Sequence, residues 1–215
     1  MRILLDDSET TITAETIGDG LEKAAFLAHQ RGRLIVEVEV DGVHWTEEDL
    51  AAPESTRRTA VEMKLLTAHP GELLQETFAQ SADAVEKLDE LQRESAHALQ
   101  SGANKLGYDK LLEALSVWAA VQTALSRGLS MGVVSPESIA SSGIDFDAAV
   151  KALDARLRAL KQAMSAQDVV ALCDELLYEF PPVIQTFVDL LRVLARAAGD
   201  AVAQSKTERK TLAGS

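Results

Sequence analysis

The sequence predicts an α+β protein, in which a small N-terminal domain with a sheet (residues 1–69) precedes an antiparallel four-helix bundle (residues 72–203). Two observations lead to this prediction. Short apolar runs of the kind that form strands end near Gly71. Beyond that point apolar residues recur at steps of three and four, which is typical of helices that bury one face, as far as Ala201. Residues 204–215 lack this spacing and are predicted to be a flexible tail.

The N-terminal domain is predicted from alternation and from turn residues. Apolar and polar residues alternate after Gly32, which is the pattern of a strand with one buried face. Thr16 is expected to cap a helix that ends near Gly32. Asp41-Gly42 supplies a tight turn between two strands. The predicted strands cover residues 2–5, 10–15, 34–40, 43–45 and 59–67, with a short helical turn at 46–50.

Two segments carry a resemblance to a known fold. Arg33-Leu34-Ile35-Val36 precedes the Asp41-Gly42 turn, and Val61-Glu62-Met63-Lys64-Leu65 closes the domain. With its order of strand, strand, helix, strand, short strand, helical turn and strand, this domain resembles the β-grasp, or ubiquitin-like, fold. The resemblance implies a built-in recognition or docking module. It does not imply conjugation to a target, which needs a free diglycine end, because here His69-Pro70-Gly71 runs into a helix.

The C-terminal domain is predicted from four apolar ladders. The last ladder keeps its spacing across Pro181-Pro182. Proline removes a helical hydrogen bond, so a kinked helix, or two nearly coaxial helices, is expected there. In either case Phe180 and Ile184 should both face the core. The predicted helices cover residues 72–100, 108–129, 146–164 and 170–201, the third capped by Asp145 or its neighbour.

The helical part is similar in architecture to export chaperones of the flagellin type, over residues 72–203. Those proteins are small, acidic and all-helical, and they lay an amphipathic helix of a client along a hydrophobic groove. The resemblance implies a protein partner, bound through such a helix.

Charge and composition exclude several other classes of function. The formal net charge is -13, which disfavours binding to nucleic acid, because phosphate binding depends on Lys and Arg. Cys173 is the only cysteine, so neither an intrachain disulfide nor a thiolate zinc cluster is expected. The sequence has no run of about 18 apolar residues, so no membrane span is expected. Acidic residues follow the first five residues, which argues against a secretory signal and favours a cytoplasmic protein.

Catalytic, cofactor and metal sites are not expected. Glu94 and His97 have the spacing found in di-iron bundles, but such a centre needs a second Glu-x-x-His and two more glutamates. The other histidines all lie within residues 1–69. Cys173 falls on an apolar ladder with no histidine near it in sequence, so a buried core thiol is predicted.

Two groups of residues are candidates for partner binding. His44 and Trp45 lie beside the Asp41-Gly42 turn, where an aromatic side chain can be a binding hot spot. Glu175, Tyr178 and Glu179 lie on the polar face at the start of the last helix.

These observations favour a non-enzymatic adaptor or export-type chaperone that binds a partner polypeptide. One alternative is a ligand-binding or enzymatic bundle, with a pocket near Pro181-Pro182 where Tyr178 and Trp118 meet a small molecule. Another is a structural homodimer that buries surplus apolar surface against its twin.

Overall fold

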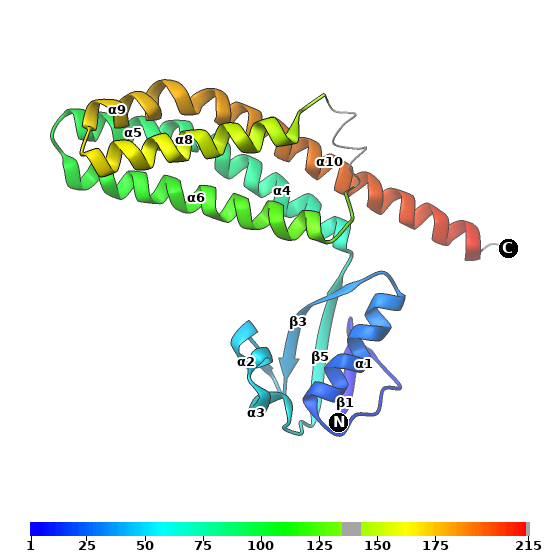
Figure 1. Cartoon of the computed structure of the whole chain (residues 1–215). Coiled ribbons are helices and arrows are strands. Elements are labelled where there is room, and N and C mark those ends of the chain that lie inside the picture. Colours follow the sequence, from blue (N-terminus) through cyan, green and yellow to red (C-terminus); the bar gives the residue numbers. More distant parts are fainter. Residues whose placement is uncertain (135–142, 214–215) are drawn as a thin grey trace. The chain divides into compact units, whose positions relative to one another are not determined.

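The computed structural model describes the backbone of residues 1–134 and 143–213, and side chains as far as residue 204. The chain divides into two compact units, Met1–Leu73 and Leu74–Ser215. A mixed sheet with a helix forms the first unit and helices form the second (Figure 1). The predicted α+β fold class is therefore confirmed.

The sheet of the first unit has five strands in the order β2-β1-β5-β3-β4. β1 and β5 are parallel, and the other neighbouring pairs are antiparallel. The strands are β1 (Arg2–Leu5), β2 (Ser8–Glu9), β3 (Leu34–Val40), β4 (Val43–His44) and β5 (Glu62–Ala68).

Helix α1 (Ile17–Gln30) packs on this sheet. The Thr16 hydroxyl accepts a hydrogen bond from the Asp19 backbone N–H, so Thr16 is the cap, as predicted. One stripe of the helix, which includes Ile17 and Ala24, packs on the apolar strand residues. Two short helices, α2 (Glu47–Ala51) and α3 (Pro53–Thr56), lie between β4 and β5. The strand residues that form this core are Ile3, Leu5, Val38, Val40, Met63 and Leu65.

The prediction of a second strand at residues 10–15 was wrong. Asp6 and Asp7 both have positive φ angles, 50° and 60°, so the chain reverses in a two-residue turn and pairing starts at Ser8. Thr10 then bonds to the Ile3 carbonyl through its backbone N–H, and the pairing ends. The second strand is consequently limited to β2.

The second unit is a helical bundle in which each long run of helix is antiparallel to the run before it (Figure 1). The predicted helix at 72–100 is divided at Lys87, which leaves α4 and α5 in tandem. Asp145 caps the third predicted helix, at 146–164, by accepting a hydrogen bond from the Ala148 N–H. Phe78, Trp118, Phe180 and Phe187 are central in the core. The helices are α4 (Pro70–Glu86), α5 (Leu88–Gln100), α6 (Asn104–Ser130), α8 (Phe146–Ala166), α9 (Val169–Asp174) and α10 (Phe180–Ala213).

A π-helical segment, η1 (Glu175–Glu179), joins α9 to α10. The Phe180 N–H donates to the Glu175 carbonyl, a step of five residues that adds one residue to the turn just before Pro181-Pro182. Both prolines thus directly follow a widened helical turn, which together with proline is a recognised cause of a kink in a continuous helix. Phe180 and Ile184 are both buried, as the preserved ladder predicted.

The flexible tail at residues 204–215 stays a prediction, and the helical backbone of α10 runs through most of this segment, to Ala213. Residues 204–213 contain neither glycine nor proline and consist mainly of good helix formers. The helix therefore has no sequence signal to stop where the apolar ladder ends.

Candidate functional site

An open hollow of about 520 Å³ lies between the tandem helices α4–α5 and helix α6, beside the break at Lys87. Its floor is apolar and its rim is charged. We call this surface the acidic groove. Its lining residues are Gln80, Asp83, Ala84, Lys87, Leu88, Glu90, Leu91, Glu94, Glu113 and Val117.

Two close helix contacts frame the acidic groove. Near one end of α6, a Cβ on Gly107 would lie 2.5 Å from the Leu99 Cγ, and the Ser95 hydroxyl donates to the Gly107 carbonyl at 2.8 Å. Near the other end, a Cβ on Gly128 would lie 2.5 Å from the Phe78 Cζ. The α6 residues that line the groove fall between these two glycines in the sequence. The helices are therefore held together on either side of the hollow.

The apolar floor of the groove is only partly covered by the packing of the bundle. Leu88 points into the core and is 1% exposed. Ala84, Leu91 and Val117 are half-buried, so part of their apolar surface faces the hollow. Apolar surface that stays accessible in a concave site can be buried by a ligand, with a gain of roughly 25 cal/mol for each Å².

The rim of the groove carries a net negative charge. Glu94 pairs with Lys110 across α5 and α6, with Lys110 Nζ 2.8 Å from Glu94 Oε2. This hydrogen bond and the charge of Glu94 raise the pKa of Lys110, and the charges of Glu113 and Glu90 add to the effect. Asp83, Glu90 and Glu113 form no ion pair with any residue whose side chain the structure describes. Their charges remain available to a cationic ligand.

The first pair of predicted candidates, His44 and Trp45, lies in the N-terminal unit. His44 is exposed on β4, with its Nε2 atom 3.8 Å from Glu39 Oε2. Trp45 is half-buried and packs against the core under α1, and its backbone N–H donates to the Val38 carbonyl. The Trp45 ring is thus part of the packing of the sheet.

His44 ends a row of residues that lie directly opposite one another across all five strands. The Cα pairings join Glu9, Leu4, Lys64, Glu39 and His44. Lys64 Nζ lies 3.3 Å from Glu39 Oε1, and this carboxylate raises the pKa of Lys64. The charged side chains on this face of the sheet are therefore largely paired with one another.

The second group of predicted candidates lies on η1. Arg156 of α8 joins two of them, because its Nη1 atom is 2.6 Å from Glu179 Oε2 and 3.5 Å from Glu175 Oε2. The Glu175 side chain is only 16% exposed, and burial raises the pKa of its carboxyl group, with Arg156 acting in the opposite direction. The 3.5 Å approach to Arg156 is an ion pair without a hydrogen bond to Glu175 Oε2. Tyr178 is 69% exposed and takes no part in this cluster.

Trp118 and Tyr178, the two rings suggested to meet a small molecule near Pro181-Pro182, lie in different surroundings. Trp118 is 3% exposed, and its ring centroid is 5.3 Å from that of Phe187 and 6.4 Å from that of Phe180. Tyr178 is largely exposed, so the two rings do not enclose a common space.

The described parts of the chain contain neither a metal-binding group nor a helix suited to cross a membrane. Within residues 1–134 and 143–204 no three His, Cys, Asp or Glu side chains come together as a metal-binding group. Glu94 pairs with Lys110, and His97 is exposed on the same helix. None of the described helices combines the length and the apolar character that crossing a membrane requires.

The acidic groove was not among the sites predicted from the sequence. One signal was present, because the apolar band of residues 72–100 is broad enough to be buried on more than one side. The groove occupies the part of that band which the bundle leaves uncovered. Comparison with protein-family models, with curated proteins and with solved structures finds no match for this chain.

Proposed function

We propose that this protein is a non-enzymatic adaptor or export-type chaperone that holds a segment of a partner polypeptide in the acidic groove. One observation carries the proposal: an apolar floor lies open between two helices that are locked together on either side of it. The concave shape, the accessible Leu91 and Val117 side chains and the charged rim suit an amphipathic segment. This arrangement supports the resemblance to flagellin-type export chaperones.

The N-terminal unit supports the same class of function. Its strand order, with β1 parallel to β5 at the centre, is the arrangement that a β-grasp-like domain would have. We propose that this unit is a docking head. Its exposed sheet face, which carries Lys64, Glu39 and His44, is the surface through which it would act.

A cytoplasmic location is part of the proposal. Cys173 is a buried free thiol, which is compatible with a reducing compartment.

Site-specific photo-crosslinking in the source cells tests the groove. A benzophenone amino acid replaces Val117 in the groove, and in the control it replaces Val150, a half-exposed residue of similar size on α8. We expect a crosslinked polypeptide with the label at position 117 and much less with the label at position 150. The same adducts at both positions, or none at position 117, would contradict the proposal.

A further inference from the structure

We infer that the occupant of the acidic groove is a helical segment with an apolar stripe flanked by Lys or Arg side chains. This inference rests on the proposed function and specifies the chemistry of the partner. It depends on the charges of the rim, their spacing along the helices and the apolar floor between them.

Carboxylates stand on both walls of the groove and outnumber its one lining cation, Lys87, which lies on the α4–α5 wall. Asp83 and Glu90 stand on the α4–α5 wall and Glu113 stands on the α6 wall. All three are exposed, and none forms an ion pair with a described residue. A segment lying between the walls would meet carboxylates on its left and on its right. Cations on both flanks of the segment therefore match the site, and acidic flanks would be repelled.

The spacing of the carboxylates suits a helix. Asp83 and Glu90 are seven residues apart, which is about two helical turns or roughly 10 Å along the axis. A helix that lies along the groove repeats each face every seven residues, so Lys or Arg at positions i and i+7 can meet both carboxylates. Apolar residues at steps of three and four would then face Leu91 and Val117.

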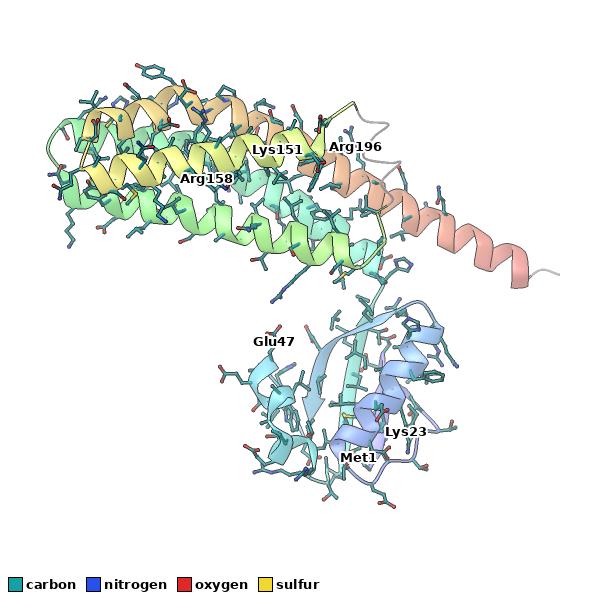
Figure 2. The ribbon with its side chains drawn as sticks, viewed as in Figure 1. Met1, Lys23, Glu47, Lys151, Arg158 and Arg196 are labelled. Carbon is teal, nitrogen blue, oxygen red and sulfur yellow. The ribbon has the colours of Figure 1, made fainter. Side chains whose placement is uncertain are left out.

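The groove also argues against other occupants. The same carboxylates would repel phosphate groups, which disfavours nucleic acid and anionic lipid headgroups. A second copy of this chain would present Lys151 and Arg158, seven residues apart on α8, so it is the main competing occupant (Figure 2). The experiment therefore includes self-association as a measured outcome.

Two fluorescent peptides of equal length test the inference on the full chain. Both carry the same Leu stripe at helical spacing, one flanked by Lys and the other by Glu. Fluorescence anisotropy measures Kd at low and at physiological salt. We expect the Lys-flanked peptide to bind at least about tenfold more tightly, with a preference that weakens as salt rises.

Matched variants separate the groove from the overall charge of the protein. Asp83→Asn, Glu90→Gln and Glu113→Gln together remove three charges from the rim. The control combines Glu22→Gln, Glu48→Gln and Glu54→Gln, which removes three exposed charges from the N-terminal unit. We expect the rim variant to weaken binding of the Lys-flanked peptide by about tenfold, and the control by less than about threefold.

The outcomes are distinguishable. Equal losses in the two variants would show attraction by net charge alone and would overturn the inference. Tighter binding of the Glu-flanked peptide would overturn it while the crosslink at position 117 still supported the proposed function. If neither peptide bound and no crosslink formed at position 117, both the inference and the proposed function would be contradicted. Sedimentation that shows a dimer, lost in the rim variant but not in the control, would assign the groove to a second copy and also overturn it. The salt dependence of the Kd for the Lys-flanked peptide can also be measured on the unmodified protein, without any variant.

Discussion

The ring of Phe78 on α4 packs against the backbone of Gly128 on α6, at the place where a side chain of residue 128 would have to lie. Because α4 and α6 can approach this closely only at a residue without a Cβ, this contact helps to fix one end of the acidic groove. It also makes residue 128 a sensitive position for substitution.

Gly128→Ala should therefore lower the free energy of unfolding by about 1 to 3 kcal/mol, because the new methyl group overlaps Phe78 and approaches Leu74 Cδ2 to 3.0 Å. Gly199→Ala is the control. There the nearest atoms belong to the end of the flexible Gln75 side chain, and alanine is the better helix former by up to about 1 kcal/mol. Urea unfolding monitored by circular dichroism measures both. A gain of stability in Gly128→Ala would contradict the contact.

Phe180→Ala should cost about 3 to 5 kcal/mol, since it empties a core position that is 1% exposed and packs beside Trp118. Tyr178→Ala, two residues earlier, removes a ring that is largely exposed and should cost less than about 1 kcal/mol. Similar losses of stability in the two variants would contradict the arrangement in which Phe180 faces the core and Tyr178 faces solvent.

Glu175→Gln should raise the melting temperature at pH 7. Burial raises the pKa of Glu175 in the folded protein, so folding disfavours its charged form, and this penalty is fully present above the folded-state pKa. As the pH falls through that pKa toward the usual value of a glutamate, the carboxyl takes up its proton and the penalty disappears. The advantage of the variant should consequently shrink in acid.

Glu179→Gln provides the comparison for this pH effect. The Glu179 side chain is 55% exposed and also pairs with Arg156, so its loss should change stability by less than about 1 kcal/mol. Thermal melts between pH 4 and pH 8 measure both variants. An advantage of Glu175→Gln that grows in acid would contradict the assigned cause.

Cys173 should react very slowly with thiol reagents in the folded protein. Its side chain is 2% exposed, its Sγ atom lies 3.6 Å from the Ala96 carbonyl oxygen, and burial raises the pKa of the thiol. A disulfide reagent at pH 8 should modify the denatured chain on the order of 100 times faster than the native chain. Comparable rates would show that α9 opens readily from α5.

The sequence by itself determined the order of the elements and most of their buried faces. Periodicity and caps are local properties, so Thr16 and Asp145 could be assigned as helix starts without any knowledge of tertiary contacts. The preserved ladder across Pro181-Pro182 likewise placed Phe180 and Ile184 in the core. Tyr178 and Glu179 could be recognised as exposed polar-face residues for the same reason, whereas the Glu175 side chain is only 16% exposed.

Only the tertiary structure decided what these faces meet. Arg156 lies on another helix, so its pairing with Glu175 and Glu179 depends on how α8 packs on η1. The acidic groove depends on the separation of two helices, which the contacts at Gly107 and Gly128 fix. The second of these contacts joins Gly128 to Phe78, which is far from it in the sequence. Periodicity shows that Leu91 and Val117 lie on apolar faces, but the amount of each face that stays uncovered is set by packing between helices, which no local pattern encodes.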